Sequence, residues 1–273
     1  MMKNPAKLLS RTGAFTKVTL KPAKTLASHL TFSLLNRFYS SLARDIPISA
    51  ETGSCLVIAP HPDDETLGCG AAIIQARKAE RDVHIIIITD GRAWPKSSLI
   101  TPEVLAAMRH EETLRACEAL GVAAENIIFL SVTDGEAMQQ VDKIADDLLR
   151  QIERLSPSQI FSPYGCDTHA DHIAVAAAMD KLVQSRAVTC RIYEYVIWFW
   201  PKQALWHLLF PYRLARLRRV STKGLLDRKR EALTRHRSQC ENLTGEANWH
   251  VFSQHDLARF FRPYELFFEK RRP

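Results

Sequence analysis

The chain has 273 residues, 46% of them hydrophobic, and a formal net charge of +7. This length and apolar content predict a globular protein of one large domain with a sizeable core. No uninterrupted apolar run approaches the ~20 residues needed to span a bilayer, which excludes a membrane-spanning protein.

The positive charge is concentrated at the start of the chain. Residues 1–44 hold eight Lys or Arg and no Asp or Glu, which leaves 29 basic and 30 acidic residues for the remainder. We therefore expect a basic, helical N-terminal extension over residues 1–48. It fits a cleaved organellar transit peptide, a flexible or domain-packing extension, or an arm that contacts an anionic membrane surface, since residues 26–42 carry apolar side chains at helical spacing.

Strands and helices alternate through the rest of the chain, residues 49–273. The predicted strands are Cys55–Ala59, Val83–Thr89, Ile127–Val132, Gln159–Pro163 and Cys190–Trp200. The predicted helices run from Asp64 to about Arg81, from Pro102 to Leu120, from Glu136 to Leu155 and from Ile173 to Val183. This alternation is typical of the α/β class and predicts a Rossmann-like, doubly wound, mostly parallel sheet flanked by helices.

Polar residues follow the first predicted strand directly. Residues 61–65 contain one imidazole and three carboxylates, and prolines 60 and 62 restrict the backbone on both sides of His61. The junction of a buried strand and a helix is the usual ligand crevice of such a sheet. Buried charge at this density is costly unless a metal or a substrate compensates it.

A second cluster of Asp167, His169, Asp171 and His172 follows the fourth predicted strand. The carboxyl ends of neighbouring parallel strands converge, so the two clusters are expected to line one crevice. Two imidazoles, one carboxylate and an open position are the usual layout of catalytic zinc, whose bound water approaches a neutral pKa. A remaining carboxylate can take the proton of that water, and a remaining histidine can act on the oxyanion or the leaving group.

The same residues carry a family resemblance. The segment A-P-H-P-D-D-E-T-L-G-C-G-A at 59–71, with T-H-A-D-H at 168–172, resembles the PIG-L/LmbE-like N-acetylglucosaminyl deacetylases. Weaker matches are T-D-G at 89–91, R-H-E-E at 109–112, residues 130–135 and H-R-S-Q at 236–239. The resemblance covers roughly residues 54–240 and implies a deacetylase domain over residues 49–273.

The resemblance implies a role for each residue of the two clusters. Zinc, or another divalent metal such as Fe²⁺, would be held by His61, Asp64 and His172. Asp63 would be the general base, and His169 would stabilise the tetrahedral intermediate or protonate the amine. Asp171 would orient a histidine from outside the metal ligands, and Glu65 would hold the motif loop.

Other polar residues are candidates for substrate contact. Arg92 follows the second strand and is a candidate ligand for a sugar or a phosphate, with a surface arginine as the alternative. Arg109 and Glu112 are spaced to form a structural ion pair on one helix.

The segment 201–239 combines eleven Lys or Arg with only two acidic residues, and tryptophans lie in or just before it. A membrane interface or an anionic lipid-linked substrate suits this composition, and a solvated basic helix is the alternative. Charge alone would also suit nucleic acid, but no reading motif accompanies it, so no nucleic-acid partner is expected. The six scattered cysteines include no C-x-x-C pair and predict reduced thiols in a cytoplasmic protein.

The sequence therefore predicts a metal-dependent hydrolase that removes the acetyl group from an N-acetylated amino sugar. The expected substrate is an N-acetylglucosamine-type glycoconjugate, with a lipid-linked one favoured by the basic segments. One rival is an amidase that acts on a non-sugar metabolite. Another is a non-catalytic sugar- or lipid-binding protein on the same scaffold.

Overall fold

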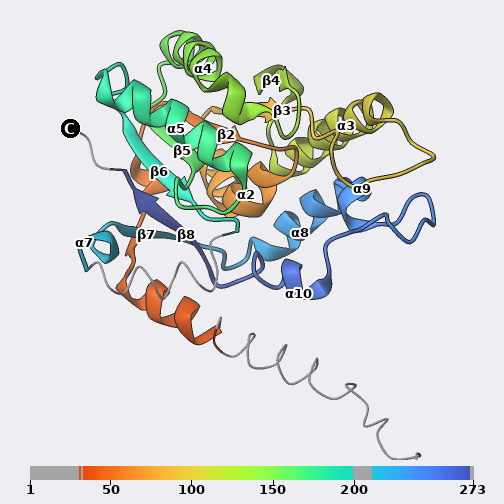
Figure 1. Ribbon diagram of the computed structural model, residues 1–273. Helices are drawn as coiled ribbons and strands as arrows, with labels where there is room; N and C mark the ends of the chain where they lie inside the picture. Colours follow the sequence, from red (N-terminus) through yellow and green to blue (C-terminus); the bar gives the residue numbers. More distant parts are fainter. Residues whose placement is uncertain (1–30, 32, 199–210, 271–273) are drawn as a thin grey trace, which may run out of the picture.

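A single mixed sheet of eight strands organises the part of the chain that the structure describes, residues 31, 33–198 and 211–270 (Figure 1). In this computed structural model the strand order is β1-β7-β8-β6-β5-β2-β3-β4. The strands are β1 (Arg44–Asp45), β2 (Cys55–Ala59), β3 (Val83–Thr89), β4 (Ile127–Val132), β5 (Gln159–Pro163), β6 (Arg191–Tyr195), β7 (Leu217–Ser221) and β8 (Tyr264–Glu269). Four of the five predicted strands have the predicted bounds.

The longer helices are α2 (Asp64–Lys78), α3 (Pro102–Leu120), α4 (Val141–Leu155), α5 (Ala170–Gln184) and α8 (Leu226–Arg235). Shorter helical segments are η1 (Ile48–Ala50), η2 (Ala124–Asn126), η3 (Ala137–Gln140), α7 (Pro211–Leu214), α9 (Arg237–Cys240) and α10 (Gln254–Leu257). The predicted ends of α3 are confirmed, because the Thr101 side chain caps its first turn and Gly121 ends it in the left-handed conformation. The segment predicted as one helix over 136–155 is a 3₁₀ turn, η3, followed by α4.

The strand order produces a switch point between β2 and β5. β2 pairs in parallel with β3 on one side and with β5 on the other, and the chain winds outward from β2 in both directions. The expected doubly wound, mostly parallel arrangement is therefore confirmed. The loops after β2 and β5 leave the same edge of the sheet side by side, which is where ligands bind in such folds.

The far half of the sheet was not predicted. β8 runs antiparallel to both β6 and β7, and β1 pairs in parallel with β7. The strand predicted over 190–200 ends at Tyr195, and residues 199 and 200 lie outside the described part. In the basic segment 201–239, residues 201–210 also lie outside it. Arg218 and Arg219 lie in strand β7 and pair with Glu269 and Asp45, so this part of the segment is not a solvated helix.

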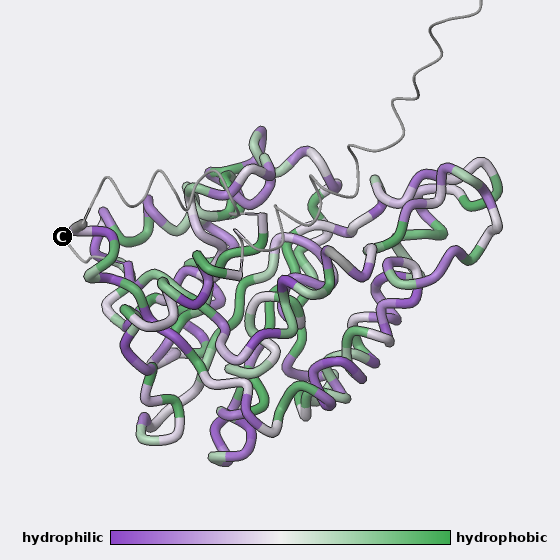
Figure 2. Tube along the Cα trace, turned by 90° about the horizontal axis from the view of Figure 1, so that it is seen from below, coloured by the Kyte–Doolittle hydropathy of each residue, from purple (hydrophilic) through white to green (hydrophobic). Residues whose placement is uncertain are grey.

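Helices cover both faces of the sheet, as the alternation of side chains along β2 requires. Cys55, Val57 and Ala59 face a core that α2, α3 and α8 complete. Leu56 and Ile58 face a second core formed with α4 and α5. Figure 2 shows the hydrophobic residues concentrated along the strands in the middle of the molecule.

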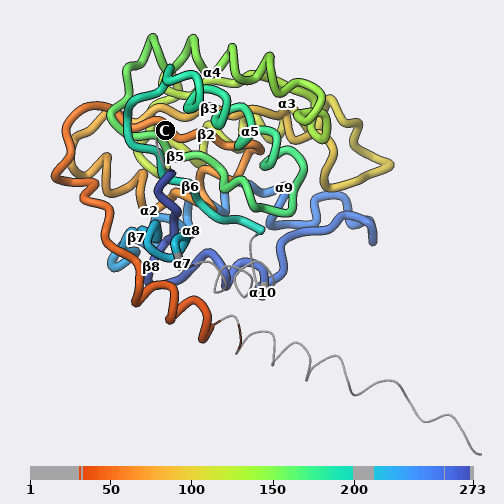
Figure 3. Tube along the Cα trace, turned by 60° about the vertical axis from the view of Figure 1, so that its left-hand side comes forward, coloured from red at the N-terminus to blue at the C-terminus, as the bar shows by residue number. Residues whose placement is uncertain are grey.

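The described part of the predicted N-terminal extension packs on the far half of the sheet. Residues 33–42 are helical, and Tyr39 and Ala43 are buried against Leu217 of β7 and Phe268 of β8. Figure 3 shows this helix beside α7, β7 and β8. Residues 1–30 and 32 of the predicted extension lie outside the described part, and the division at residue 48 stays a prediction.

A buried ion pair, Lys229 with Glu265, bonds to the backbone of α2. The Glu265 carboxylate accepts hydrogen bonds from the backbone amides of Ala71 and Ala72, at 2.7 and 3.0 Å. Lys229 Nζ donates to the carbonyl of Leu67 at 2.8 Å and to Glu265 at 2.6 Å. The Lys229 side chain lies close against Gly70, where a Cβ would come within 3.0 Å of it. The pair thereby ties α2, which follows the first cluster, to α8 and β8.

We expect Glu265→Gln to lower the free energy of unfolding by about 3–5 kcal/mol, because Lys229 would keep a buried charge without its partner. Urea denaturation would measure the loss. The control is Glu231→Gln, which removes an exposed pair with Arg235 and should change stability by about 0.5 kcal/mol or less. Equal losses in the two variants would contradict this account of the ion pair.

Candidate active site and metal centre

The loop after β2 holds its first cluster in an unusual backbone conformation. Asp63 has φ 132°, a region that residues other than glycine rarely adopt. Its amide donates to Glu65 Oε2 at 3.0 Å, and Glu65 Oε1 lies 3.0 Å from Nε2 of the buried His236. Glu65 and His236 thus stabilise a conformation that costs free energy on its own. The sequence pattern placed His236 only in a weak motif and did not predict this contact.

The second cluster lies where α5 begins, three residues earlier than predicted. His169 is the N-cap residue of α5 and accepts a hydrogen bond from the amide of Asp171. Asp171 and His172 are therefore in the first turn of the helix and fully buried. Because Asp171 and His172 lie in a helical turn, their side chains have fixed positions relative to the neighbouring loop after β2.

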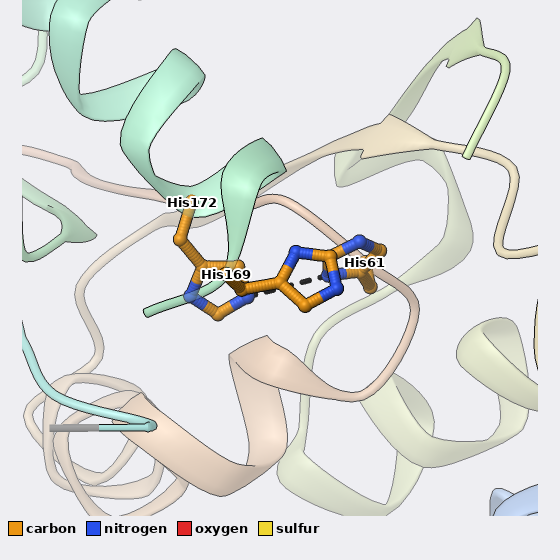
Figure 4. A group of neighbouring side chains, drawn as sticks. All are labelled: His61, His169 and His172. Carbon is orange, nitrogen blue, oxygen red and sulfur yellow. Dashed lines mark hydrogen bonds between the residues drawn. The ribbon is translucent and has the colours of Figure 1, made fainter. Parts of the chain in front are cut away.

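Three donor atoms from the two clusters form a nearly equilateral triangle. His61 Nδ1 and Asp64 Oδ2 are 3.2 Å apart, His172 Nε2 and Asp64 Oδ2 are 3.1 Å apart, and the two histidine nitrogens are 3.3 Å apart. Figure 4 shows the His61 and His172 rings converging, with His169 beside them. A tetrahedral zinc with bonds of about 2.0–2.2 Å separates its ligands by roughly 3.3–3.5 Å. These atoms therefore fit a small tetrahedral metal ion.

Carboxylates orient both imidazoles from the side opposite the triangle. His172 Nδ1 lies 3.3 Å from Asp167 Oδ2, and His61 Nε2 lies 3.0 Å from Asp171 Oδ2. Asp134 Oδ1 is a further neighbour of His61 Nε2, at 3.3 Å. Asp134 lies in the weak match at residues 130–135, but no role was predicted for it. Such carboxylate partners are typical of metal-binding histidines, because they fix the tautomer and the ring orientation.

The electrostatics of the triangle favour charged side chains. Burial opposes ionisation of Asp64, yet the two imidazoles hold the pKa of its carboxyl well below the usual range. Burial also opposes a charged imidazole at His172, but the Asp64 carboxylate outweighs it and raises the pKa of His172 to about 9. A metal binds the neutral imidazole, so metal binding at this site would release a proton.

Asp63 points to a different partner. Its Oδ2 lies 3.1 Å from Nη2 of Arg109, which is itself buried. Burial raises the pKa of Asp63 to about 7, although the Arg109 guanidinium favours the charged form. Arg109 also donates to the carbonyls of Pro62, Gly91 and Trp94, at 2.5, 2.9 and 3.2 Å.

The ion pair predicted for Arg109 and Glu112 is not formed. Glu112 instead accepts hydrogen bonds from the amide and hydroxyl of Ser238, at 2.8 and 2.7 Å. The i,i+3 spacing places both residues on one side of α3, but it does not show that Asp63 pairs with Arg109 and that Ser238 of α9 bonds to Glu112. Arg109 is thus a residue of the site. Its place in the weak R-H-E-E match was recognised from the sequence, but its pairing with Asp63 was not predicted.

The two clusters open into one cavity of about 480 Å³. His61, Asp63, Asp64 and His169 contribute to its polar part. The His169 ring lies 4.6 Å from that of His61, and burial, followed by the neighbouring imidazoles, lowers the pKa of His169. The remaining lining residues are Leu67, Ala93, Trp94, Arg109, Asp134, Gly135, Trp198, Gln239, His250, Val251, Phe252 and Asp256.

Arg92 lies apart from the other predicted site residues. Its guanidinium contacts Asp90 at 2.7 Å and Glu103 at 3.2 Å, and it lines a separate cavity of about 390 Å³. A role for Arg92 in substrate binding stays a prediction.

The whole arrangement provides three donor atoms at a spacing that fits a metal ion, an acidic side chain and a third imidazole around one cavity. This is the set of groups that metal-assisted hydrolysis requires.

Comparison with known proteins supports the same view. Residues 56–183 match the family model described as PIG-L, GlcNAc-PI de-N-acetylase. The uncharacterized deacetylase YaiS of Escherichia coli (strain K12) is 30% identical over 143 residues, which cover 50% of this chain and 67% of that protein. The chain belongs to the PIG-L family.

Two further proteins are similar to this chain over different shares of its length. A probable N-acetyl-alpha-D-glucosaminyl L-malate deacetylase 2 of Bacillus subtilis (strain 168) is 30% identical over 129 residues, 45% of this chain and 58% of that protein. The solved N,N'-diacetylchitobiose deacetylase of Pyrococcus horikoshii has the same fold, with a TM-score of 0.62 at 20% identity over 80% of this chain and 83% of that one.

The spacing of the donor atoms predicts that His61 and His172 bind the metal and that His169 does not. We expect His172→Ala to weaken zinc binding by more than about 100-fold, since losing a ligand should cost more than losing a carboxylate partner. His169→Ala, which removes an imidazole outside the triangle, should change zinc affinity only a few-fold. Competition with a chromophoric chelator would measure both affinities. Equal losses in the two variants would contradict the proposed ligand set.

Proposed function

We propose that this chain is a metal-dependent hydrolase that removes the acetyl group from an N-acetylated amino sugar of the N-acetylglucosamine type. The products are acetate and a free amine. The observation that carries the proposal is the convergence of the His61, Asp64 and His172 donor atoms beside Asp63 and His169 in one cavity. Family membership supports it, as do relatives named as deacetylases of N-acetyl-glucosaminyl compounds.

The metal is proposed to be zinc, with Fe²⁺ as the alternative, held by His61, Asp64 and His172. Two nitrogens and one oxygen with room for a further ligand suit catalytic zinc. When bound, such an ion supplies Lewis-acid activation of water and of the acetyl carbonyl. His61 and His172 coordinate only as neutral imidazoles, which Asp171 and Asp167 orient.

Asp63 is the proposed general base. Its carboxylate takes the proton of the attacking water, which it can do only when ionised. Arg109 keeps the carboxylate in place through the 3.1 Å contact and favours the ionised form. The same guanidinium binds the carbonyl of Pro62, so the base and its loop are held together.

His169 is proposed to stabilise the charge that develops on the acetyl oxygen or to protonate the departing amine. The hydrogen bond from the Asp171 amide to His169 Nδ1 sets the ring orientation, so that Nε2 is the nitrogen left for the substrate. Asp171 accepts backbone hydrogen bonds from Gly135 and Ala137, at 2.9 and 3.1 Å, and so holds His61 in a fixed position. Its proposed role is therefore to position a metal ligand.

Arg92 is proposed to contact a part of the substrate remote from the acetamido group. It lies between Asp90, which lines the neighbouring cavity with it, and Ala93 and Trp94, which line the catalytic cavity. Its ion pairs with Asp90 and Glu103 would then fix the guanidinium for such a contact.

We expect Asp63→Asn to lower the rate of acetate release by about 10²–10⁴ while zinc stays bound, because the variant removes a base and no ligand. The measurements are acetate release from a panel of N-acetyl sugars and metal content. Full activity in Asp63→Asn, or no acetate from any sugar with zinc bound, would contradict the proposal. Faster release from simple amides than from sugars would favour the non-sugar amidase. Unaltered sugar binding without turnover in both proteins would favour a binding protein.

We further propose that the protein contacts an anionic membrane surface peripherally, in the cytoplasm. Within the described part of the chain every helix is too short or too polar to cross a bilayer. The helix at 33–42 nevertheless exposes Leu34, Phe38 and Leu42 on its outer face, at 68%, 46% and 44% of their surface. This stripe lies in a segment that contains only basic charges, which suits anionic lipid. A cytoplasmic location is supported by the six cysteines, none of which forms a disulfide.

We expect the triple substitution of Leu34, Phe38 and Leu42 by Ser to reduce flotation with phosphatidylserine liposomes at least several-fold. Substitution is preferred to deletion of residues 1–44, because the three stripe residues are exposed whereas the deletion would also remove the buried Tyr39 and Ala43. Leu99→Ser, at an exposed position on a loop outside this helix, is the matched control. Unchanged flotation, or a change only in oligomeric state, would contradict membrane contact by this face.

A further inference from the structure

The catalytic cavity has two chemically different sets of lining residues. We refer to His61, Asp63, Asp64 and His169 as its polar floor, and to Trp94, Trp198, Val251 and Phe252 as its apolar wall. The Trp94 ring stacks on His250 with ring centres 5.3 Å apart and planes at 5°. The Trp198 ring stacks on Phe252 at 6.4 Å. Each aromatic residue of the wall therefore stacks on another ring: Trp94 on His250, and Trp198 and Phe252 on each other.

The two loops that carry most of the wall are fastened together. Glu246 accepts hydrogen bonds from the amide and hydroxyl of Ser98, at 2.8 and 2.6 Å, and from the hydroxyl of Ser97. The buried Trp249 anchors the second loop through its indole N–H, which donates to the carbonyls of Ser238 and Glu241. A wall held in this way is organised before any ligand arrives, which lowers the entropy cost of binding.

The wall is also fixed relative to the reacting groups. The carbonyl of Trp94 accepts a hydrogen bond from Arg109, the same side chain that holds Asp63. The amide of Trp198 donates to Asp167 at 3.0 Å, the carboxylate beside His172. The apolar surface therefore lies in a set position with respect to both the proposed base and the proposed metal.

Polar groups near the wall are engaged within the protein. Asp256 accepts hydrogen bonds from the amide and hydroxyl of Ser253, and Gln239 donates to the carbonyl of Trp94. The face of the His250 ring is stacked on Trp94. Meanwhile Trp94 and Val251 leave 44% and 38% of their surface open to solvent. Exposed apolar surface that lines a cavity indicates a ligand with an apolar part.

We propose that the apolar wall binds an apolar aglycone, so that the substrates are amino sugars linked to a hydrophobic group rather than free sugars or polar conjugates. This inference rests on the proposed deacetylase function. The acetamido group would lie at the polar floor with Asp63 and His169, and the aglycone would lie along Trp94, Trp198, Val251 and Phe252. Burial of the aglycone removes water from both surfaces, and each methylene removed from water favours binding.

The test compares octyl and methyl glycosides of N-acetylglucosamine with the zinc-loaded full chain, below the micelle concentration of the octyl compound. We expect kcat/KM for acetate release to be at least about tenfold higher for the octyl glycoside, chiefly through a lower KM. In Trp94→Ala and Val251→Ser the octyl-to-methyl ratio should fall towards one. Val104→Ala, at an exposed apolar position on α3 outside the cavity, should leave the ratio unchanged.

The outcomes separate this inference from the function on which it rests. Acetate release from both glycosides at equal kcat/KM, or a ratio that the two wall variants do not change, would overturn the aglycone site and leave the deacetylase function intact. No acetate from either glycoside would overturn the function. In that case calorimetric titration of Asp63→Asn with both glycosides decides whether the apolar wall binds the aglycone. Tighter binding of the octyl glycoside supports the aglycone site, and equal binding of the two glycosides overturns it.

Discussion

One buried carboxylate holds the centre of this structure together. Asp64 lies within 3.2 Å of an imidazole from its own loop and within 3.1 Å of one from the helix after β5. Buried charge is expensive unless it is paired, and here each member is paired: Asp64 with both imidazoles, His61 with Asp171, and His172 with Asp167. The network replaces the hydration that each group lost, and it leaves the three donor atoms at the spacing a metal ion needs. The same contacts thus stabilise the fold and define the proposed metal site.

The remaining supports act on the loop that carries Asp63. The Asp63 backbone adopts an unfavourable φ. Glu65, which contacts His236, accepts a hydrogen bond from the Asp63 amide, and Arg109 contacts the Asp63 carboxylate. Close packing behind the loop is equally specific. A Cβ on Gly68 would lie 2.4 Å from the ring of Tyr195, whose hydroxyl donates to the carbonyl of Ile58 in β2. The glycine lets α2 approach β6 closely, and so it helps to set where the helix begins relative to the sheet.

Two apolar surfaces lie outside the polar floor of the site. The apolar wall lines the cavity, and the stripe of Leu34, Phe38 and Leu42 lies on the helix that packs against β7 and β8. Both expose large apolar side chains, and water disfavours such exposure unless a partner covers it. A hydrophobic aglycone would account for the first surface and an anionic lipid surface for the second. The two assignments are independent, because different side chains carry each of them.

The strands from β2 to β5 and the presence of both polar clusters were predictable from the amino-acid sequence alone. They were predictable because β-branched runs, proline breaks and capping residues are local signals, and because core packing does not account for carboxylates and imidazoles gathered at two strand ends. The parallel order of these strands then made it predictable that the clusters meet. The partners of Arg109, Glu112 and His236 could be known only from the folded chain, since each partner lies far away in the sequence and no spacing rule identifies it. The folded chain also revealed that β8 pairs antiparallel with β6 and β7 and that Arg92 lies apart from the catalytic cavity. Those features depend on which segments pack against one another in the folded protein, and no single segment carries that information.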